Sequence, residues 1–251
     1  MKRPRASEAG VTLMEVLIAV TLLGLLSGGI LMALRVGISA MGTANTRLMS
    51  NRRVAGAARI LEQQIAGFMP VTAPCAPGSE PAVPGRILFF QGEPQAMRFV
   101  STYSLGEAWR GTPRILEFLV ISGENGRGVR LIVNEVPYTG PFAAGTLCVS
   151  RGVDPTLGLP VTHFVPIQPG PASFVLADRL ASCRFLYLFP AIPPDRPVEE
   201  WVPLWALPRW PLAVRVEMVP LPEEVGRLHP ATVTVPFRVN RNPEISYADL
   251  P

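Results

Sequence analysis

The sequence predicts an α+β fold, in which a long N-terminal helix precedes an antiparallel, β-rich globular domain. Only one of the 28 prolines, Pro4, precedes residue 70, and a proline costs about 3 kcal/mol inside a helix. A long apolar run without a single charge extends from Val16 to Leu34. Beyond residue 85, apolar residues instead alternate with polar ones, which is the period of a half-buried strand.

Composition limits the class of protein. Of the 251 residues, 48% are apolar and 17% are charged, and the charged share is below the usual quarter. This shortage of charge fits a membrane-anchored or assembled protein better than a free cytosolic one. The net charge of +4 is small, so no nucleic-acid partner is expected.

The absence of prolines allows one helix over residues 11–67. Its first half is apolar on all sides, and the 19 residues from Val16 to Leu34 would make about 28 Å of helix at roughly 1.5 Å per residue, enough to cross a bilayer. Its second half is amphipathic. The apolar positions of that half recur at helical spacing: Met41, Ala44, Leu48, Ala55, Ala58, Leu61 and Ile65.

Prolines and glycines cluster in residues 68–85, which predicts an irregular connection. The β-rich domain is then expected over residues 86–251. The glycine-rich residues 123–128 separate two apolar runs and predict a hairpin. The many prolines indicate short or edge strands. The expected strands are Met97–Tyr103, Ile115–Ile121, Val129–Val136, Cys183–Phe189, Leu212–Val219 and Thr232–Val239.

No catalytic site, cofactor site or metal site is predicted, and the chain is not expected to be an enzyme. The only two histidines are His163 and His229, and neither has a partner at ligand or catalytic spacing. His163 lies in an apolar run and is interpreted as a half-buried strand residue. The segment Asn240–Glu244 lacks the clustered acidic ligands that calcium would need.

Two features of the β-rich region leave alternatives open. Cys75, Cys148 and Cys183 all follow the apolar run. In an oxidising compartment they would make one disulfide and leave one free thiol, whereas buried unpaired cysteines are the alternative. The tryptophan-bearing, proline-rich segment Trp201–Trp210 is either a partner surface or the core of a loop.

Glu15 is the most unusual residue, because it immediately precedes the apolar run. An ionisable group at mid-bilayer costs about 2.5–3.5 kcal/mol or more, so a partner for this carboxylate is expected. An ordinary signal peptide has a shorter apolar region of about 7–15 residues, and a plain membrane anchor gives the carboxylate no purpose. The remaining alternative is a helix-start carboxylate lying in the headgroup layer.

The residues Gly10-Val11-Thr12-Leu13-Met14-Glu15, with a basic start before them and the apolar run after them, resemble the class III leader of type IV pilins and type II secretion pseudopilins. Val11 departs from the phenylalanine or methionine usual there. The resemblance implies that residues 1–10 are a leader. It implies cleavage by a prepilin peptidase between Gly10 and Val11, and N-methylation of Val11. It also implies that Glu15 pairs with the N-terminal amine of the neighbouring subunit during filament assembly.

The later part of the chain resembles the minor pseudopilin J family of type II secretion. The resemblance lies in Leu180–Phe189, Trp201, Trp205 and Leu207-Pro208 ahead of Ala213–Glu217. It implies a single-pass inner-membrane protein with its β-rich domain in the periplasm. Its implied partners are other minor and major pseudopilins, in a hetero-oligomeric filament that supports protein export. A W-like minor pilin of type IV pili is the alternative, and an anchored periplasmic enzyme or binding module is a third.

Overall fold

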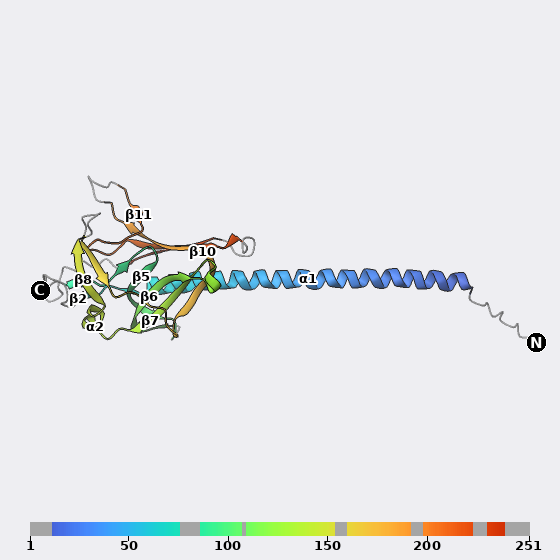
Figure 1. Ribbon diagram of the computed structural model, residues 1–251, viewed down its shortest axis with the longest axis horizontal. Coiled ribbons are helices and arrows are strands. Elements are labelled where there is room, and N and C mark those ends of the chain that lie inside the picture. Colours follow the sequence, from blue (N-terminus) through green and yellow to red (C-terminus); the bar gives the residue numbers. More distant parts are fainter. Residues whose placement is uncertain are drawn as a thin grey trace, which may run out of the picture. The chain divides into compact units, whose positions relative to one another are not determined.

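The computed structural model confirms the α+β fold, with a long helix followed by a large antiparallel sheet domain (Figure 1). It describes residues 12–75, 86–106, 109–153, 160–191, 198–222 and 230–238. The leader positions Gly10 and Val11, His229 and the segment Asn240–Glu244 lie outside the described residues. The chain divides into two compact units, Met1–Met49 and Ser50–Pro251, which are described separately below.

In the first unit, helix α1 begins at Leu13, and it ends at Ala66 in the second unit. Leucine, a strong helix former, is the most frequent residue of its first half. Every described side chain from Leu13 to Ile38 is exposed. In the described part of the chain, this 26-residue segment is the one stretch of helix long and apolar enough to span a membrane.

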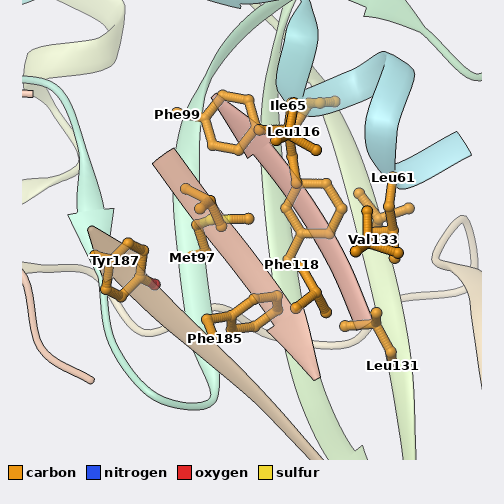
Figure 2. Close-up of a cluster of buried hydrophobic side chains, with 14 of the residues drawn as sticks. Leu61, Ile65, Met97, Phe99, Leu116, Phe118, Leu131, Val133, Phe185 and Tyr187 are labelled. Carbon is orange, nitrogen blue, oxygen red and sulfur yellow. The ribbon is translucent and has the colours of Figure 1, made fainter. Parts of the chain in front are cut away.

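In the second unit, the last turns of α1 pack on the sheet. Ala57, Leu61 and Ile65 recur every four residues on one face of the helix, and all three are buried. Leu61 and Ile65 lie against the aromatic and aliphatic side chains of the central strands (Figure 2). The burial of Leu61 and Ile65 confirms the amphipathic pattern predicted at this end of the helix.

The helix ends at a glycine because another backbone approaches closely there. The amide of Gly67 donates to the carbonyl of Gln63 at 3.0 Å. A Cβ at Gly67 would lie 2.6 Å from Ser101 Oγ, so no larger residue fits without a shift. Ser101 Oγ in turn donates to the carbonyl of Gln64 at 2.8 Å. A strand side chain thus satisfies a carbonyl that the end of the helix leaves without an intrahelical partner.

The main sheet has the strand order β1-β5-β6-β7-β10-β12-β13, with β4 beside β5 and β11 beside β10. All of its pairs are antiparallel. Two separate two-stranded sheets are formed by β2-β3 and by β8-β9. The strand bounds are β1 Phe68–Met69, β2 Thr72–Pro74, β3 Arg86–Leu88, β4 Gln91–Gly92, β5 Ala96–Ser104, β6 Trp109–Ser122, β7 Val129–Pro137, β8 Cys148–Val153, β9 Pro160–Phe164, β10 Phe174–Phe189, β11 Glu200–Val202, β12 Ala213–Pro220 and β13 Ala231–Pro236.

The hairpin predicted at residues 123–128 is confirmed, since β6 and β7 pair antiparallel on either side of it. The 3-10 turn Glu124–Gly126 closes the hairpin. Gly128 has a φ of +63°, and a Cβ there would lie 2.3 Å from the carbonyl oxygen of Leu180. Both the positive φ and the close approach of β10 therefore require glycine at this position.

The main sheet buries apolar side chains on both faces. On one face, α1 and the curved strands β10, β12 and β13 enclose a core that includes Phe99, Phe118 and Phe185. The other face carries a smaller core, to which β2, β3, β8 and the short helix α2 (Pro141–Gly145) contribute. Val100 and Ile115 belong to this second core because successive strand residues point to opposite faces.

The connection expected over residues 68–85 is more regular than its composition indicates. Its described part, residues 68–75, contains β1 and β2, and both strands are paired. Residues 76–85 lie outside the described residues. Strand β8 and the first half of β10 are further elements that the sequence did not predict, whereas β9 contains the strand residue His163 expected from the sequence.

Candidate functional site

The N-terminus of α1 is built around Thr12. The amide of Glu15 donates to the carbonyl of Thr12 at 3.0 Å and to its Oγ1 at 3.3 Å. The amide of Val16 also donates to the Thr12 carbonyl, at 3.3 Å. Thr12 is therefore the N-cap residue of the helix, and its side chain satisfies one of the first amides. The spacing Thr12-x-x-Glu15 is that of a capping box, a signal that the sequence analysis did not use.

The Glu15 carboxylate lies in the first turn of α1, and the residue is exposed. Among residues 12–75 and the other described segments, no cationic side chain forms an ion pair with it. A carboxylate at a helix N-terminus gains about 0.3–1 kcal/mol from the helix dipole. That gain is smaller than the cost of about 2.5–3.5 kcal/mol for an ionised group at mid-bilayer. The helix end alone therefore does not compensate Glu15 in an apolar surrounding.

The apolar half of α1 is bracketed by two charges of opposite sign. Glu15 and Arg35 flank the charge-free run, and both are exposed. At about 1.5 Å per residue, the twenty-residue offset corresponds to roughly 30 Å, which is about the thickness of a bilayer hydrocarbon core. A bilayer can therefore cover the whole run while both charges remain at its two polar boundaries.

A second charged group lies deep inside the β domain. Arg98 on β5 is 1% exposed, and its Nε lies 2.8 Å from Oε1 of Glu117 on the neighbouring strand β6. Its two remaining nitrogens donate to Gln91 Oε1 and to the carbonyl of Val165, each at 2.8 Å. Burial lowers the pKa of Arg98, and the nearby Glu117 carboxylate acts in the opposite direction.

The same cluster attaches the segment between β9 and β10 to the sheet. Asn134 on β7 donates to Glu117 Oε2 at 3.2 Å and to the carbonyl of Gln168 at 2.9 Å. Ser173 Oγ donates to Asn134 Oδ1 at 2.5 Å. These bonds satisfy the groups around Arg98 within the chain, so the cluster holds the fold together and exposes no reactive group.

The three cysteines form one disulfide bond and leave one free thiol. Cys75 and Cys148 form a disulfide with a Cα–Cα distance of 5.2 Å, so β8 is covalently linked to the residue that follows β2. Cys183 on β10 is a free, buried thiol. Burial raises the pKa of Cys183 to about 12. The thiolate is therefore disfavoured, and Cys183 is not an activated nucleophile.

The tryptophan-bearing segment divides between core and surface. Trp205 and Trp210 are buried and belong to the main core. Trp201 on β11 is half-buried, and the Arg215 guanidinium lies 4.0 Å from the centre of its ring. Trp205 and Trp210 are thus core residues, and Trp201 makes a cation–π contact with Arg215.

His163 lies on strand β9, as expected, but it is exposed rather than half-buried. Within the part of the chain that the structure describes, no group of three or more histidine, cysteine, aspartate or glutamate side chains is placed to hold a metal ion. Of the site residues predicted from the sequence, Glu15 is the one that lies among the described residues.

No protein-family model matches this chain, and no curated protein matches it.

Proposed function

We propose that the protein is a minor pseudopilin of a type II secretion system, and that its work is assembly rather than catalysis. The observation that carries the proposal is that Glu15, which has no ion-pair partner among the described residues, lies near the start of an exposed apolar segment of membrane length, Leu13–Ile38. Neither feature has a use in an isolated soluble domain. Both have a use in a subunit that waits in a membrane and then packs with other helices.

Before assembly, the inner membrane would cover the first half of α1, with the β-rich domain in the periplasm. The charge-free run matches the bilayer core in length, as argued above. The Cys75–Cys148 disulfide supports the periplasmic side, because disulfides persist in oxidising compartments.

On assembly, helices of other subunits would replace the lipid. Cleavage after Gly10 by a prepilin peptidase creates a new α-amino group at Val11, close to the first turn of the helix. In the filament, the Glu15 carboxylate of one subunit would pair with this amine of the next. A charge that is costly alone and compensated only in the correct neighbour sets the register of packing, as single polar groups do in other helical assemblies. The β-rich domain would then contact other minor subunits near the filament tip.

Mass spectrometry of the protein extracted from membranes tests the processing step. The expected N-terminus is Val11 carrying an N-methyl group. A retained Met1, or a start near Met41, would contradict the proposal.

A pair of variants tests the role of Glu15. Glu15→Ala is expected to be processed normally but to be lost from filaments, because the paired charge is missing. Thr12→Ala is the matched control, since it removes the N-cap side chain, worth about 1 kcal/mol, and keeps the carboxylate. Incorporation of both variants at the wild-type level would show that Glu15 does not set the register.

Affinity capture of the processed full chain from solubilised membranes identifies its filament. Recovery of other pseudopilins is the expected result. Recovery of pilus subunits would assign the chain to type IV pili as a W-like minor pilin instead.

A further inference from the structure

The β domain contains a cleft of about 490 Å³. Strand β3, the β8–β9 hairpin and residues 204–209 beyond β11 form its walls. This volume lies within the range of about 300–1,000 Å³ typical of ligand sites. Neither α1 nor Glu15 contributes to it.

The wall made by residues 204–209 is held in place by the sheet. The amide of Trp205 donates to the carbonyl of Gly92 at 2.8 Å, and its indole Nε1 donates to the carbonyl of Arg209 at 2.7 Å. A Cβ at Gly92 would lie 2.7 Å from the Cβ of Trp205. The close contact therefore depends on glycine, and this wall is pre-organised.

Phe164, another lining residue, is also fixed by its contacts. Phe164 on β9 packs edge-on against Phe89, with ring centres 5.7 Å apart. Arg98 also lies over the Phe164 ring, at 5.7 Å. Glu93, the one carboxylate among the lining residues, accepts a hydrogen bond from Gln91 at 2.7 Å. The lining therefore holds one carboxylate against three arginines.

Three exposed arginines line the cleft from three different segments: Arg86, Arg151 and Arg209. None of them forms an ion pair with a carboxylate of the described residues. Arg86 donates one hydrogen bond to the carbonyl of Thr72 at 3.4 Å. Guanidinium groups without a carboxylate partner attract anions, and carboxylates match their planar donor pattern. The remaining lining is largely apolar, with Phe90, Leu204 and Leu207 among its members.

Two strands at the cleft also have an unpaired edge. Among the described residues, β3 is paired only with β2, and β9 only with β8. An extended segment can add to such an edge through main-chain hydrogen bonds. A ligand that pairs with a strand edge and also binds the arginines needs an extended backbone that carries acidic side chains. Apolar side chains between the acidic ones would contact the remaining, apolar walls.

We infer that this cleft is a docking site for an extended acidic segment of a partner protein. The arginines would bind its carboxylates, and β3 or β9 would pair with its backbone. This binding does not depend on cleavage at Gly10 or on Glu15, so it can be tested independently of the filament function.

Fluorescence anisotropy of the full chain in a neutral detergent tests the inference. The probe is a fluorescein-labelled peptide of alternating glutamate and valine, and its companion carries glutamine in place of glutamate. Saturable binding of the acidic peptide is expected, with about tenfold weaker binding or none for the companion. Arg151→Gln should weaken binding of the acidic peptide about tenfold, and added salt should weaken it further.

A charge-matched pair of triple variants provides the control. Replacing Arg86, Arg151 and Arg209 with glutamine should abolish binding. Replacing Arg59, Arg127 and Arg238 with glutamine removes the same charge from exposed positions outside the cleft lining and should leave binding within about twofold of wild type. Circular dichroism of both variants checks that the fold is retained.

Three results would overturn the inference. The first is no saturable binding of the acidic peptide by the wild type. The second is equal weakening in the two triple variants, which would indicate only a general charge effect. The third is tighter binding of a single-stranded oligonucleotide or of anionic vesicles than of the peptide. Mass spectrometry at Val11 remains an independent readout of the filament function in each case.

Discussion

Two apolar regions of this protein each contain one conspicuous charged residue, and the two residues differ in whether the described chain supplies an ion-pair partner. Arg98 lies inside the β domain with Glu117 at 2.8 Å and every remaining nitrogen bonded. Glu15 lies at the start of the apolar helix without an ion-pair partner in the described chain. The β domain thus compensates its charge internally, whereas no described residue compensates Glu15, which under the proposed function pairs with a neighbouring subunit.

The same contrast holds for apolar side chains within helix α1. Leu61, near its end, is 0% exposed, whereas Leu23, in its first half, is 64% exposed. A leucine side chain gains about 1.5–3 kcal/mol when it is fully buried. That stabilisation is realised within the chain at Leu61, while at Leu23 the proposed function assigns it to lipid or to other helices.

Removal of Arg98 should have the largest effect on stability. Arg98→Ala leaves the Glu117 carboxylate buried without its cation, and breaking such a pair costs about 3–5 kcal/mol. Arg184→Ala is the control, because its ion pair with Glu217 lies at the surface and such pairs contribute about 1 kcal/mol at most. Urea unfolding of the full chain in detergent, followed by tryptophan fluorescence, measures both. Equal losses would mean that the β domain does not depend on its internal compensation.

The two leucines provide the next test. Leu61→Ala should destabilise the β domain by about 2–5 kcal/mol, through lost burial and the cavity that remains. Leu23→Ala should leave the unfolding midpoint of the β domain unchanged, because the Leu23 side chain is 64% exposed. The same urea titration measures both variants. A matching shift for Leu23→Ala would show that the apolar half is covered by the chain itself.

The disulfide links the small sheet β2-β3 to the small sheet β8-β9 and should contribute somewhat less to stability than the core residues. The double variant Cys75→Ala/Cys148→Ala is expected to lose about 2–4 kcal/mol, since the bridge closes a long loop in the unfolded chain. Reductant should lower the stability of the wild type toward that of the variant. If reductant lowers the stability of the double variant as well, the effect does not come from this bridge.

The smallest effect is expected from Cys183 and depends on pH. Its pKa is raised from 9.0 to about 12 by burial, so above pH 9 the unfolded chain releases a proton that the folded chain retains. Stability should therefore fall as pH rises, approaching about 1.4 kcal/mol per pH unit from this group between its two pKa values. Cys183→Ala should show a shallower decline in urea unfolding between pH 9 and 10.5. Parallel declines would mean that the thiol is not protected in the core.

The sequence predicted strands in which burial alternates, and it also predicted β5, which is buried over most of its length. On β12, Val214, Val216 and Met218 are buried while Arg215 and Glu217 are partly exposed, so the pattern was readable. The first half of β10, Phe174–Ser182, lacks this alternation in burial, with Leu180 as its one buried residue. The sequence of this segment therefore has no apolar–polar alternation that would predict a strand.

Pairings between distant residues could not be read from the sequence. Arg98 and Glu117 lie directly opposite each other on β5 and β6, but this becomes visible only when the register is known. The cysteine spacing likewise allowed several pairings, and folding alone brings Cys75 to Cys148. By contrast, the N-cap at Thr12 was present in the sequence as a threonine three residues before Glu15, which is a local signal.

Photocrosslinking from position 23 tests the central claim most directly, namely that the apolar half of α1 is covered from outside the chain. A benzophenone amino acid would replace Leu23 in the full-length protein within its native membranes. The expected crosslinks are to membrane lipid and to the N-terminal helices of other filament subunits, and Glu15→Ala should remove the helix crosslinks while keeping those to lipid. Crosslinks confined to the protein's own residues 56–238 would contradict the account.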